Sequence, residues 1–279
     1  MIRNAITVDV EDYFQVEAFA GIIRRDDWDS YEPRVVANTC RILDQFAAAG
    51  VHGTFFTLGW VAERHPQLVR RIVAEGHELA SHGHGHQRVD RLDAAGFRAD
   101  ISRAKRLLED IGQVAVAGYR APTFSISART PWAYSVLEET GHRYSSSVYP
   151  IRHDLYGAPD APRVPFRPGD GSLWELPMST VRVLERNLPC SGGGFFRLLP
   201  YALFRLGLRA ANRAGRIGIF YTHPWEIDAG QPRMVQAGRL SKFRHYLNLA
   251  ATSRRLDRLL RDFAWDRMDV AFAEILSPT

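Results

Sequence analysis

Short apolar segments alternate with segments of helical periodicity along most of this chain. Strands are predicted at residues 5–10, 53–58, 78–81, 114–119, 144–148, 173–176, 218–222 and 269–272. Helices are predicted at residues 35–49, 66–75, 93–111, 131–140, 200–214 and 240–263. Because parallel strands need crossover connections, this order predicts an α/β fold with a parallel sheet or a barrel covered by helices. We find no repeat or linker, and expect a single domain over residues 1–279.

Charge and cysteine content narrow the classes of function. The net charge is +5, and Lys105 and Lys242 are the only lysines among 36 basic residues. No basic run is interleaved with aromatic residues, so we expect no nucleic-acid partner. Arginines also suit anionic glycans or phosphates, although a general preference for arginine is the simpler explanation. Cys40 and Cys190 show neither metal-type spacing nor a disulfide framework.

Targeting and membrane signals are absent from the sequence as read. The first ten residues enter strand-like sequence without the apolar stretch and cleavage site of a signal peptide. No segment is long enough and uniformly apolar enough to be a membrane span, so we expect a cytoplasmic protein. Residues 200–214 mix Leu, Phe and Arg, which favours packing against the barrel, with peripheral membrane contact as the alternative. The oligomeric state is not indicated.

A histidine-rich segment follows the predicted strand at residues 78–81. It reads Ser81-His82-Gly83-His84-Gly85-His86, with His82 and His86 four positions apart. That spacing lets both rings reach one metal ion, and short His-rich tracts are often metal sites. A polar, solvated turn is the alternative.

Carboxylates end the first predicted strand, in the sequence Asp9-Val10-Glu11-Asp12. Three carboxylates this close repel one another unless a cation or an arginine lies nearby. Two histidines and a carboxylate are a common ligand set for a catalytic metal with open positions. Strand alternation places Asp9 and Glu11 on one face, whereas Asp12 lies beyond the strand. A solvent-facing acidic loop is the alternative.

Polar and aromatic residues near other strand ends complete the set of candidates. His223 follows the strand at residues 218–222 and could act as a general acid or base. The alternative is a core histidine whose ring is hydrogen-bonded within the protein. Arg120 could hold a carboxylate ionised, or form an ordinary surface ion pair. Trp174 and Trp225 could be platforms for a sugar ring or parts of the core.

Taken in order, these motifs resemble those of the NodB-homology polysaccharide deacetylases, the metal-dependent carbohydrate esterases of the fourth family. The matching segments are Thr7-Val8-Asp9, Gly53-Thr54-Phe55-Phe56, residues 76–86 from Gly76-His77-Glu78 through the His segment, Tyr119-Arg120-Ala121-Pro122 and Tyr221-Thr222-His223. The resemblance implies a distorted (β/α) barrel of about seven strands, similar to a TIM barrel with fewer strands. It also implies a divalent metal cofactor, for which we expect zinc.

The resemblance also implies roles for individual residues. Asp9 matches the base that activates water, Arg120 the arginine that orients it, and His223 the acid that protonates the leaving amine. His82 and His86 match the metal histidines. The backbone N–H of Thr123 would stabilise the oxyanion.

This chain departs from the family pattern at four places. Thr123 replaces an aromatic residue, which a backbone contact can tolerate. Val10 separates the two acidic residues that are usually adjacent, so the metal carboxylate is Glu11 or Asp12; strand parity favours Glu11. The segment Tyr144-Ser145-Ser146-Ser147 lacks an aspartate often found there, which leaves the partner of Arg120 open. His84 stands where the family often has an aromatic residue.

A narrower resemblance concerns deacetylases found with exosortase and exopolysaccharide gene clusters. It lies in the segments at residues 9–14, 192–200 and 221–228, and it implies a family-specific C-terminal part of the domain. We therefore expect removal of N-acetyl groups from an amino-sugar polysaccharide or its precursor in exopolysaccharide biosynthesis. An amidase or imidase acting on small non-sugar amides and a non-catalytic glycan-binding relative are the alternatives. The sequence leaves open the sugar, and whether it is polymeric or lipid-linked.

Overall fold

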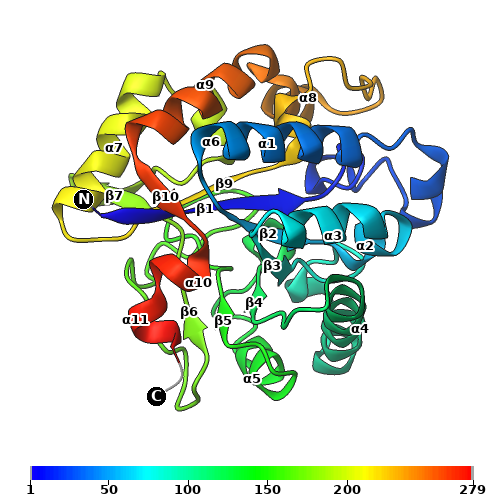
Figure 1. Ribbon diagram of the computed structural model, residues 1–279, viewed down its shortest axis with the longest axis horizontal. Coiled ribbons are helices and arrows are strands. Elements are labelled where there is room, and N and C mark those ends of the chain that lie inside the picture. Colours follow the sequence, from blue (N-terminus) through cyan, green and yellow to red (C-terminus); the bar gives the residue numbers. More distant parts are fainter. Residues whose placement is uncertain (1, 278–279) are drawn as a thin grey trace.

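A parallel sheet curled into a distorted barrel organises the protein, as a computed structural model of residues 2–277 describes it (Figure 1). The strand order is β10-β1-β2-β3-β4-β5-β6, with β9 also paired to β1. The strands are β1 (Arg3–Val10), β2 (Thr54–Thr57), β3 (Glu78–Ser81), β4 (Gly118–Tyr119), β5 (Tyr144–Ser145), β6 (Trp174–Glu175), β9 (Ile219–Thr222) and β10 (Ala264–Asp266). Within residues 2–277 no ladder joins β6 to β9, so the barrel is open there. The predicted α/β fold with a distorted (β/α) barrel is confirmed.

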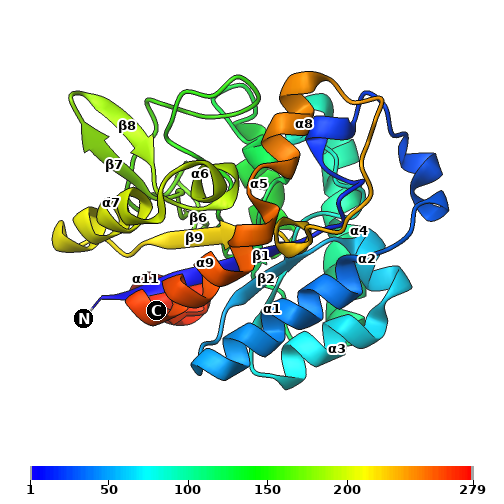
Figure 2. The same cartoon turned by 90° about the horizontal axis from the view of Figure 1, so that it is seen from above.

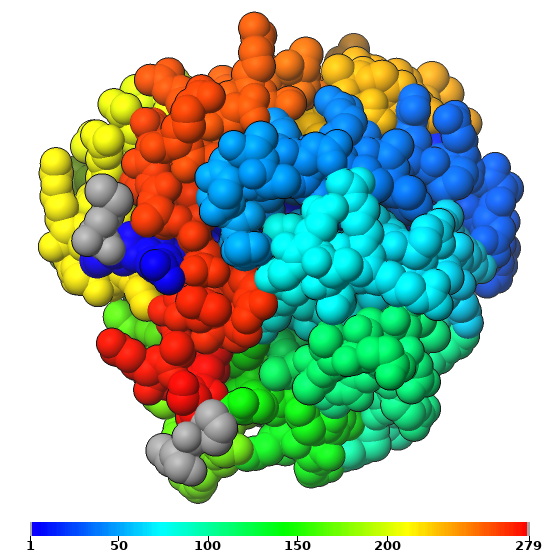
Figure 3. Space-filling view, in the orientation of Figure 1, coloured from blue at the N-terminus to red at the C-terminus, as the bar shows by residue number. Residues whose placement is uncertain are grey.

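Helices cover the outside of this sheet. They are α1 (Val35–Ala49), α2 (Gly59–Arg64), α3 (Pro66–Ala74), α4 (Ala94–Gly112), α5 (Trp132–Glu139), α6 (Gly193–Leu198), α7 (Tyr201–Arg213), α8 (Arg239–Tyr246), α9 (Leu249–Asp262), α10 (Met268–Ala271) and α11 (Ala273–Leu276). Helix α1 contacts both α3 and α9, and together they form much of the face shown in Figure 3. None of the helices described within residues 2–277 is both long and apolar enough to cross a bilayer.

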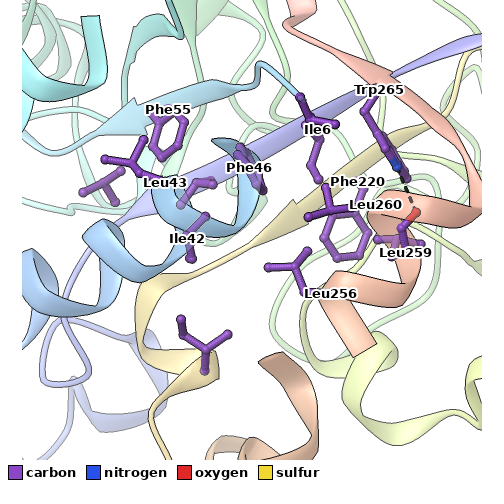
Figure 4. Close-up of a cluster of buried hydrophobic side chains, with 14 of the residues drawn as sticks. Ile6, Ile42, Leu43, Phe46, Phe55, Phe220, Leu256, Leu259, Leu260 and Trp265 are labelled. Atoms are coloured by element: carbon purple, nitrogen blue, oxygen red, sulfur yellow. Dashed lines mark hydrogen bonds between the residues drawn. The ribbon is translucent and has the colours of Figure 1, made fainter. Parts of the chain in front are cut away.

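The largest apolar core lies between β1, β2 and β9 on one side and α1 and α9 on the other (Figure 4). Ile6 and Phe220 come from neighbouring strands, and Phe46 and Leu256 reach them from the two helices. All four side chains are buried, which removes large apolar surfaces from water and fixes β1 and β9 side by side. The loops that follow these two strands therefore begin from fixed positions.

The C-terminal region differs from the sequence prediction. Residues 269–271 lie in α10 rather than in a strand and Phe272 follows that helix; the last strand is Ala264–Asp266, paired with Arg3–Ala5. A short apolar run fits a helix or a strand equally well, and only the free edge of β1 decides which segment pairs. The helix predicted at residues 240–263 is two helices, because Asn248 adopts a left-handed conformation with φ 53°.

A two-stranded hairpin, β7 (Thr180–Val183) and β8 (Arg186–Pro189), was not predicted (Figure 2). Its turn places Leu184 and Glu185 at positive φ, where Asn and Gly are the usual signal. The strand predicted at residues 114–119 is reduced to Gly118–Tyr119. Helix α7 packs on the barrel through Phe204 and other apolar residues, while Leu203 and Leu206 stay exposed.

A candidate metal centre at the strand ends

Polar side chains from four strands meet at the carboxyl edge of the sheet. Asp9 lies near the end of β1, and His82, Arg120 and His223 directly follow β3, β4 and β9. In barrels of parallel strands this edge carries the functional groups. Asp9, His82 and Arg120 are buried, and His223 is partly exposed. Burial of so many charged groups indicates that they stabilise one another or a ligand.

Three of these buried groups have the geometry of a metal site. One ligand atom each from Glu11, His82 and His86 lies within 4.8 Å of the other two, the one such cluster among residues 2–277. Glu11 Oε2 is 2.6 Å from His86 Nε2, and the ring centres of His82 and His86 are 5.2 Å apart. Burial alone would raise the pKa of Glu11, but the neighbouring charge of His86 holds this pKa well below its usual range.

The ring of His82 is oriented for coordination by its other nitrogen. Its Nδ1 lies 2.8 Å from the carbonyl oxygen of Arg120, a contact that places the proton on Nδ1. Nε2 is then left with a lone pair for a metal ion. Burial lowers the pKa of His82 to about 4, so the ring is neutral at physiological pH, as a ligand must be.

The segment that carries the histidines is fixed from two sides. From α4, the Asp100 carboxylate accepts hydrogen bonds from the backbone N–H groups of His84 and Gly85 at 2.8 and 3.0 Å. From the N-terminal loop, Arg25 Nε donates to the carbonyl of Gly85 at 2.6 Å. His86 itself has a left-handed conformation with φ 50°, which turns its ring back toward Glu11.

Glu11 and Asp12 occupy different environments. Trp225 Nε1 donates to Glu11 Oε1 at 3.1 Å, which leaves Oε2 toward His86. Asp12 Oδ2 instead accepts the backbone N–H groups of Arg34 and Val35 at 2.7 and 2.8 Å, at the start of α1. Burial raises the pKa of Asp12 to about 6 even though these N–H groups lower it. The structure thus brings Glu11, and not Asp12, to the histidine pair.

Asp9 is paired with Arg120 below this cluster. Arg120 Nη1 donates to Asp9 Oδ1 and to Thr7 Oγ1, each at 2.6 Å. Its Nε and Nη2 bond the carbonyl and hydroxyl oxygens of Ser146, both at 3.0 Å, and its guanidinium lies 4.1 Å from the centre of the Phe56 ring. Ser146 therefore holds the arginine where the sequence lacks the expected aspartate.

His223 lies across the site from Arg120. Its Nε2 is 3.9 Å from Asp9 Oδ2 and 3.7 Å from Glu11 Oε1, and its Nδ1 is 3.6 Å from Glu226 Oε2. Burial would lower the pKa of His223, but the carboxylates of Glu226 and Glu11 raise it to about 9. The ring can therefore carry a proton at neutral pH.

Glu226 and Arg197 form a buried ion pair behind His223 that sequence reasoning missed. Arg197 Nε donates to Glu226 Oε1 at 3.0 Å, and Thr222 Oγ1 donates to Oε2 at 2.9 Å. Burial would raise the pKa of Glu226, but the charge of Arg197 lowers it to about 2. Both residues lie in segments that carry the narrower resemblance, which was the available signal.

The residues expected to contact substrate lie in different settings. Trp225 is 6% exposed, and its ring is stacked with those of His223 and His245, so protein covers it where a sugar platform would be open. Trp174 packs in β6 beside Arg167, whose guanidinium lies 5.0 Å from its ring centre. Thr123 follows Arg120 closely and has φ 55°, which turns the chain sharply after β4.

The donor set of Glu11, His82 and His86 fits a divalent ion such as zinc. It offers two imidazoles and one carboxylate in a buried position, with further coordination positions left for water or substrate. Glu11 Oε2 is buried without a conventional hydrogen-bond donor, so a cation would satisfy it.

Two family models match this chain. Residues 26–145 match the polysaccharide deacetylase model, and residues 146–273 match a model described as a domain of unknown function (DUF3473). A peptidoglycan-N-acetylglucosamine deacetylase of Bacillus cereus is 35% identical over 86 residues, 31% of this chain and 29% of that protein. A chitooligosaccharide deacetylase of Bradyrhizobium sp. is 30% identical over 108 residues, 39% of this chain and 47% of that protein. The chain thus spans less than half the length of these relatives.

Solved structures extend the likeness over the whole fold. A crystal structure from Mycobacterium smegmatis that is assigned to the polysaccharide deacetylases covers 99% of this chain and 92% of its own, with a TM-score of 0.61 at 23% identity. A peptidoglycan N-acetylglucosamine deacetylase covers 97% and 88%, with a TM-score of 0.52 at 15% identity. These structures show that the chain shares their fold, and residues 26–145 match the polysaccharide deacetylase family model.

Proposed function

We propose that this protein is a metal-dependent hydrolase that removes N-acetyl groups from an amino-sugar glycan. One observation carries the proposal: the Glu11, His82 and His86 cluster lies beside the Asp9–Arg120 pair and His223 at one edge of the sheet. A candidate metal cluster, a carboxylate held by an arginine and a protonatable imidazole around one point support amide hydrolysis.

We assign to each residue the role that the family resemblance implies. A bound divalent ion would polarise the acetamide carbonyl and make water acidic. Arg120 holds the Asp9 carboxylate through Oδ1, and Asp9 Oδ2 takes the proton of the attacking water. His223 Nε2, opposite, gives a proton to the leaving amine. The backbone N–H of Thr123 donates to the developing oxyanion.

Both matched parts of the chain contribute to this site. Residues 146–273 supply His223, Glu226 and Arg197, whereas His82, His86 and Arg120 come from residues 26–145. The sheet is also continuous across the junction, because β5 pairs with β6. We therefore treat residues 1–279 as one domain with a family-specific C-terminal part.

The substrate class rests on the relatives and on the motifs. The relatives named above are deacetylases of chitooligosaccharide and of peptidoglycan, which makes an acetylated amino-sugar glycan the natural partner. Residues 9–14, 192–200 and 221–228 resemble deacetylases of exopolysaccharide gene clusters. The role proposed for the enzyme is therefore in exopolysaccharide biosynthesis.

Acetate release from acetylated chito-oligosaccharides, measured together with the zinc content of the protein, tests this function. We expect His86→Ala to lose metal and activity together, and Asp9→Asn to keep metal and lose activity. His84→Gln is the matched control, since His84 lies in the same segment outside the cluster, and it should keep both. Full activity after chelation, or turnover of small cyclic amides without any glycan deacetylation, would overturn the proposal.

A further inference from the structure

A small cavity lies next to His86, between the N-terminal loop and the His segment. Its volume is about 190 Å³, and its lining includes Gln15, Arg24, Arg25, Trp28, His86 and Arg91. His86 also belongs to the candidate metal cluster, so the cavity and the cluster share this residue. A substrate bound at the cluster would have its neighbouring parts within reach of this cavity.

Gln15 provides an unused hydrogen-bond donor in this lining. The residue is 4% exposed, and its Oε1 accepts the backbone N–H of Asp12 at 2.8 Å. That bond fixes which end of the amide is oxygen, and the buried Nε2 has no acceptor among the described residues. A buried donor without a partner is costly, so such a group indicates a missing acceptor.

The charge around the cavity is positive. Arg25 donates to the backbone carbonyls of Gly85 and His86 and forms no ion pair within residues 2–277, with the charges of Asp100 and Glu17 near it. Arg91 is paired with Glu17 at 2.6 Å, and Arg24 only approaches the exposed Asp26 at 3.6 Å. Three guanidinium groups therefore face one carboxylate in the lining. An anionic acceptor would satisfy both this charge and the free donor of Gln15.

We propose that this cavity is a subsite for a carboxylate on the sugar unit beside the one that is deacetylated. The proposal rests on the proposed function and narrows its substrate class to acidic amino-sugar glycans. A carboxylate in the cavity accepts from Gln15 Nε2 and from guanidinium groups of the lining at once. The carboxylate belongs either to a uronic acid or to a lactyl ether.

Kinetics on matched oligosaccharides test the subsite. The substrates are neutral N-acetylglucosamine oligomers, oligomers alternating N-acetylglucosamine with glucuronate, and glycan strands alternating N-acetylglucosamine with N-acetylmuramate. We expect kcat/KM to be at least about tenfold higher on one acidic series than on the neutral one, mainly through KM. The series that is preferred identifies the source of the carboxylate.

Two variants link this preference to the cavity. Gln15→Glu keeps the acceptor for the Asp12 N–H but replaces the free donor with a charged oxygen, so the acidic-to-neutral ratio should fall about tenfold. Arg24→Gln should lower the same ratio, and added salt should do so too. Arg213→Gln, which changes an exposed arginine of α7, is the control and should leave the ratio unchanged.

The outcomes separate this inference from the function on which it rests. Equal kcat/KM on acidic and neutral oligomers, or a ratio unaffected in both variants, would overturn the subsite while leaving the deacetylase proposal intact. Absence of acetate release from every series by the metal-loaded protein would overturn the deacetylase proposal itself. Circular dichroism of Gln15→Glu shows whether this variant is folded, and Arg24→Gln carries the test if it is not.

Discussion

Glu11 and Asp12 are adjacent carboxylates with separate tasks. Glu11 faces the two histidines, whereas Asp12 accepts three backbone N–H groups, those of Tyr13, Arg34 and Val35. Parity along β1 predicted that Glu11 would share a face with Asp9, but it could not place Asp12. The helix-capping contact of Asp12 depends on α1 returning to the end of β1, which no local pattern reveals.

Substitution of the two carboxylates should separate metal binding from stability. Glu11→Ala is expected to lower zinc affinity by at least about 100-fold, because it removes one of three ligands. Asp12→Ala should instead lower the free energy of unfolding by about 1–3 kcal/mol, because backbone N–H groups at the start of α1 lose their acceptor. Isothermal titration with zinc and urea denaturation measure the two effects. Retained zinc affinity in Glu11→Ala would contradict the assignment.

Arg197 and Glu226 are both almost fully buried, so each charge needs the other to offset the loss of water. We expect Glu226→Gln to destabilise the fold by about 3–5 kcal/mol, since the arginine is left without its counter-ion. Activity should fall as well, because the carboxylate beside His223 Nδ1 is lost. Urea denaturation and acetate release measure these effects. The double variant with Arg197→Met is the control, and it should be more stable than the sum of the single losses predicts.

At the level of elements, the turn between β8 and α6 determines how β9 is held. Gly192 has φ 130° and bridges Tyr221, and a Cβ at this position would lie 2.0 Å from the carbonyl oxygen of Tyr221. Only glycine fits such a position. Gly194, two residues later in α6, has open space where a Cβ would lie, with no other atom within 4 Å. The Gly-rich turn was visible in the sequence, but its contact with β9 was not.

Alanine substitutions at these two glycines should therefore have opposite effects. Gly192→Ala is expected to destabilise the protein by about 2–5 kcal/mol and to lower activity, because β9 must move and His223 follows it. Gly194→Ala should be neutral or stabilise by up to about 1 kcal/mol, since alanine favours the helix. Thermal denaturation compares the two variants. Similar stability of both would show that the close approach at Gly192 can relax.

Elements with a strong pattern were predictable, and elements decided by distant contacts were not. The helix at Val35–Ala49 and the strand at Glu78–Ser81 have the predicted bounds, because their periodicity and glycine stops are local. The β7–β8 hairpin lacks the usual turn residues, and α10 lies where a strand was predicted. In both cases packing against neighbouring elements outweighs a short local preference.

Over the whole molecule, the order of strands along the chain is enough to place the candidate residues at one edge of the sheet. Asp9, His82, Arg120 and His223 were predicted at strand ends, and in the structure these strand ends lie together. Their individual roles remain predictions. Contacts that support them, such as Trp225 on Glu11 and Ser146 on Arg120, join segments more than 20 residues apart. A single sequence contains no periodicity that reports such contacts.

Loss of folding stability at low pH is expected to arise in part from His142, a buried histidine outside the candidate metal cluster. His142 is 3% exposed, its Nδ1 lies 3.0 Å from Thr140 Oγ1, and its ring meets the edge of Tyr119. Burial lowers the pKa of His142 to about 3, from an ordinary value of 6.5. Below pH 6.5 the unfolded chain therefore binds a proton at His142, whereas the folded protein binds it only as the pH approaches 3. The contribution of this residue is complete above pH 6.5 and is lost as the pH falls toward 3.

His142→Phe should remove this contribution while filling the same space. The aromatic contact with Tyr119 remains, and Thr140 Oγ1 still donates to the carbonyl of Val136 at 2.8 Å. Between pH 7.5 and 5.5 the variant should gain about 1.4 kcal/mol relative to the unsubstituted protein, one pKa unit of linkage. Urea denaturation of both proteins with a chelator present measures the difference. Protonation of the metal histidines affects both proteins equally and cancels in the comparison. A stability difference that stays constant over this range would mean that folding leaves the pKa of His142 unchanged.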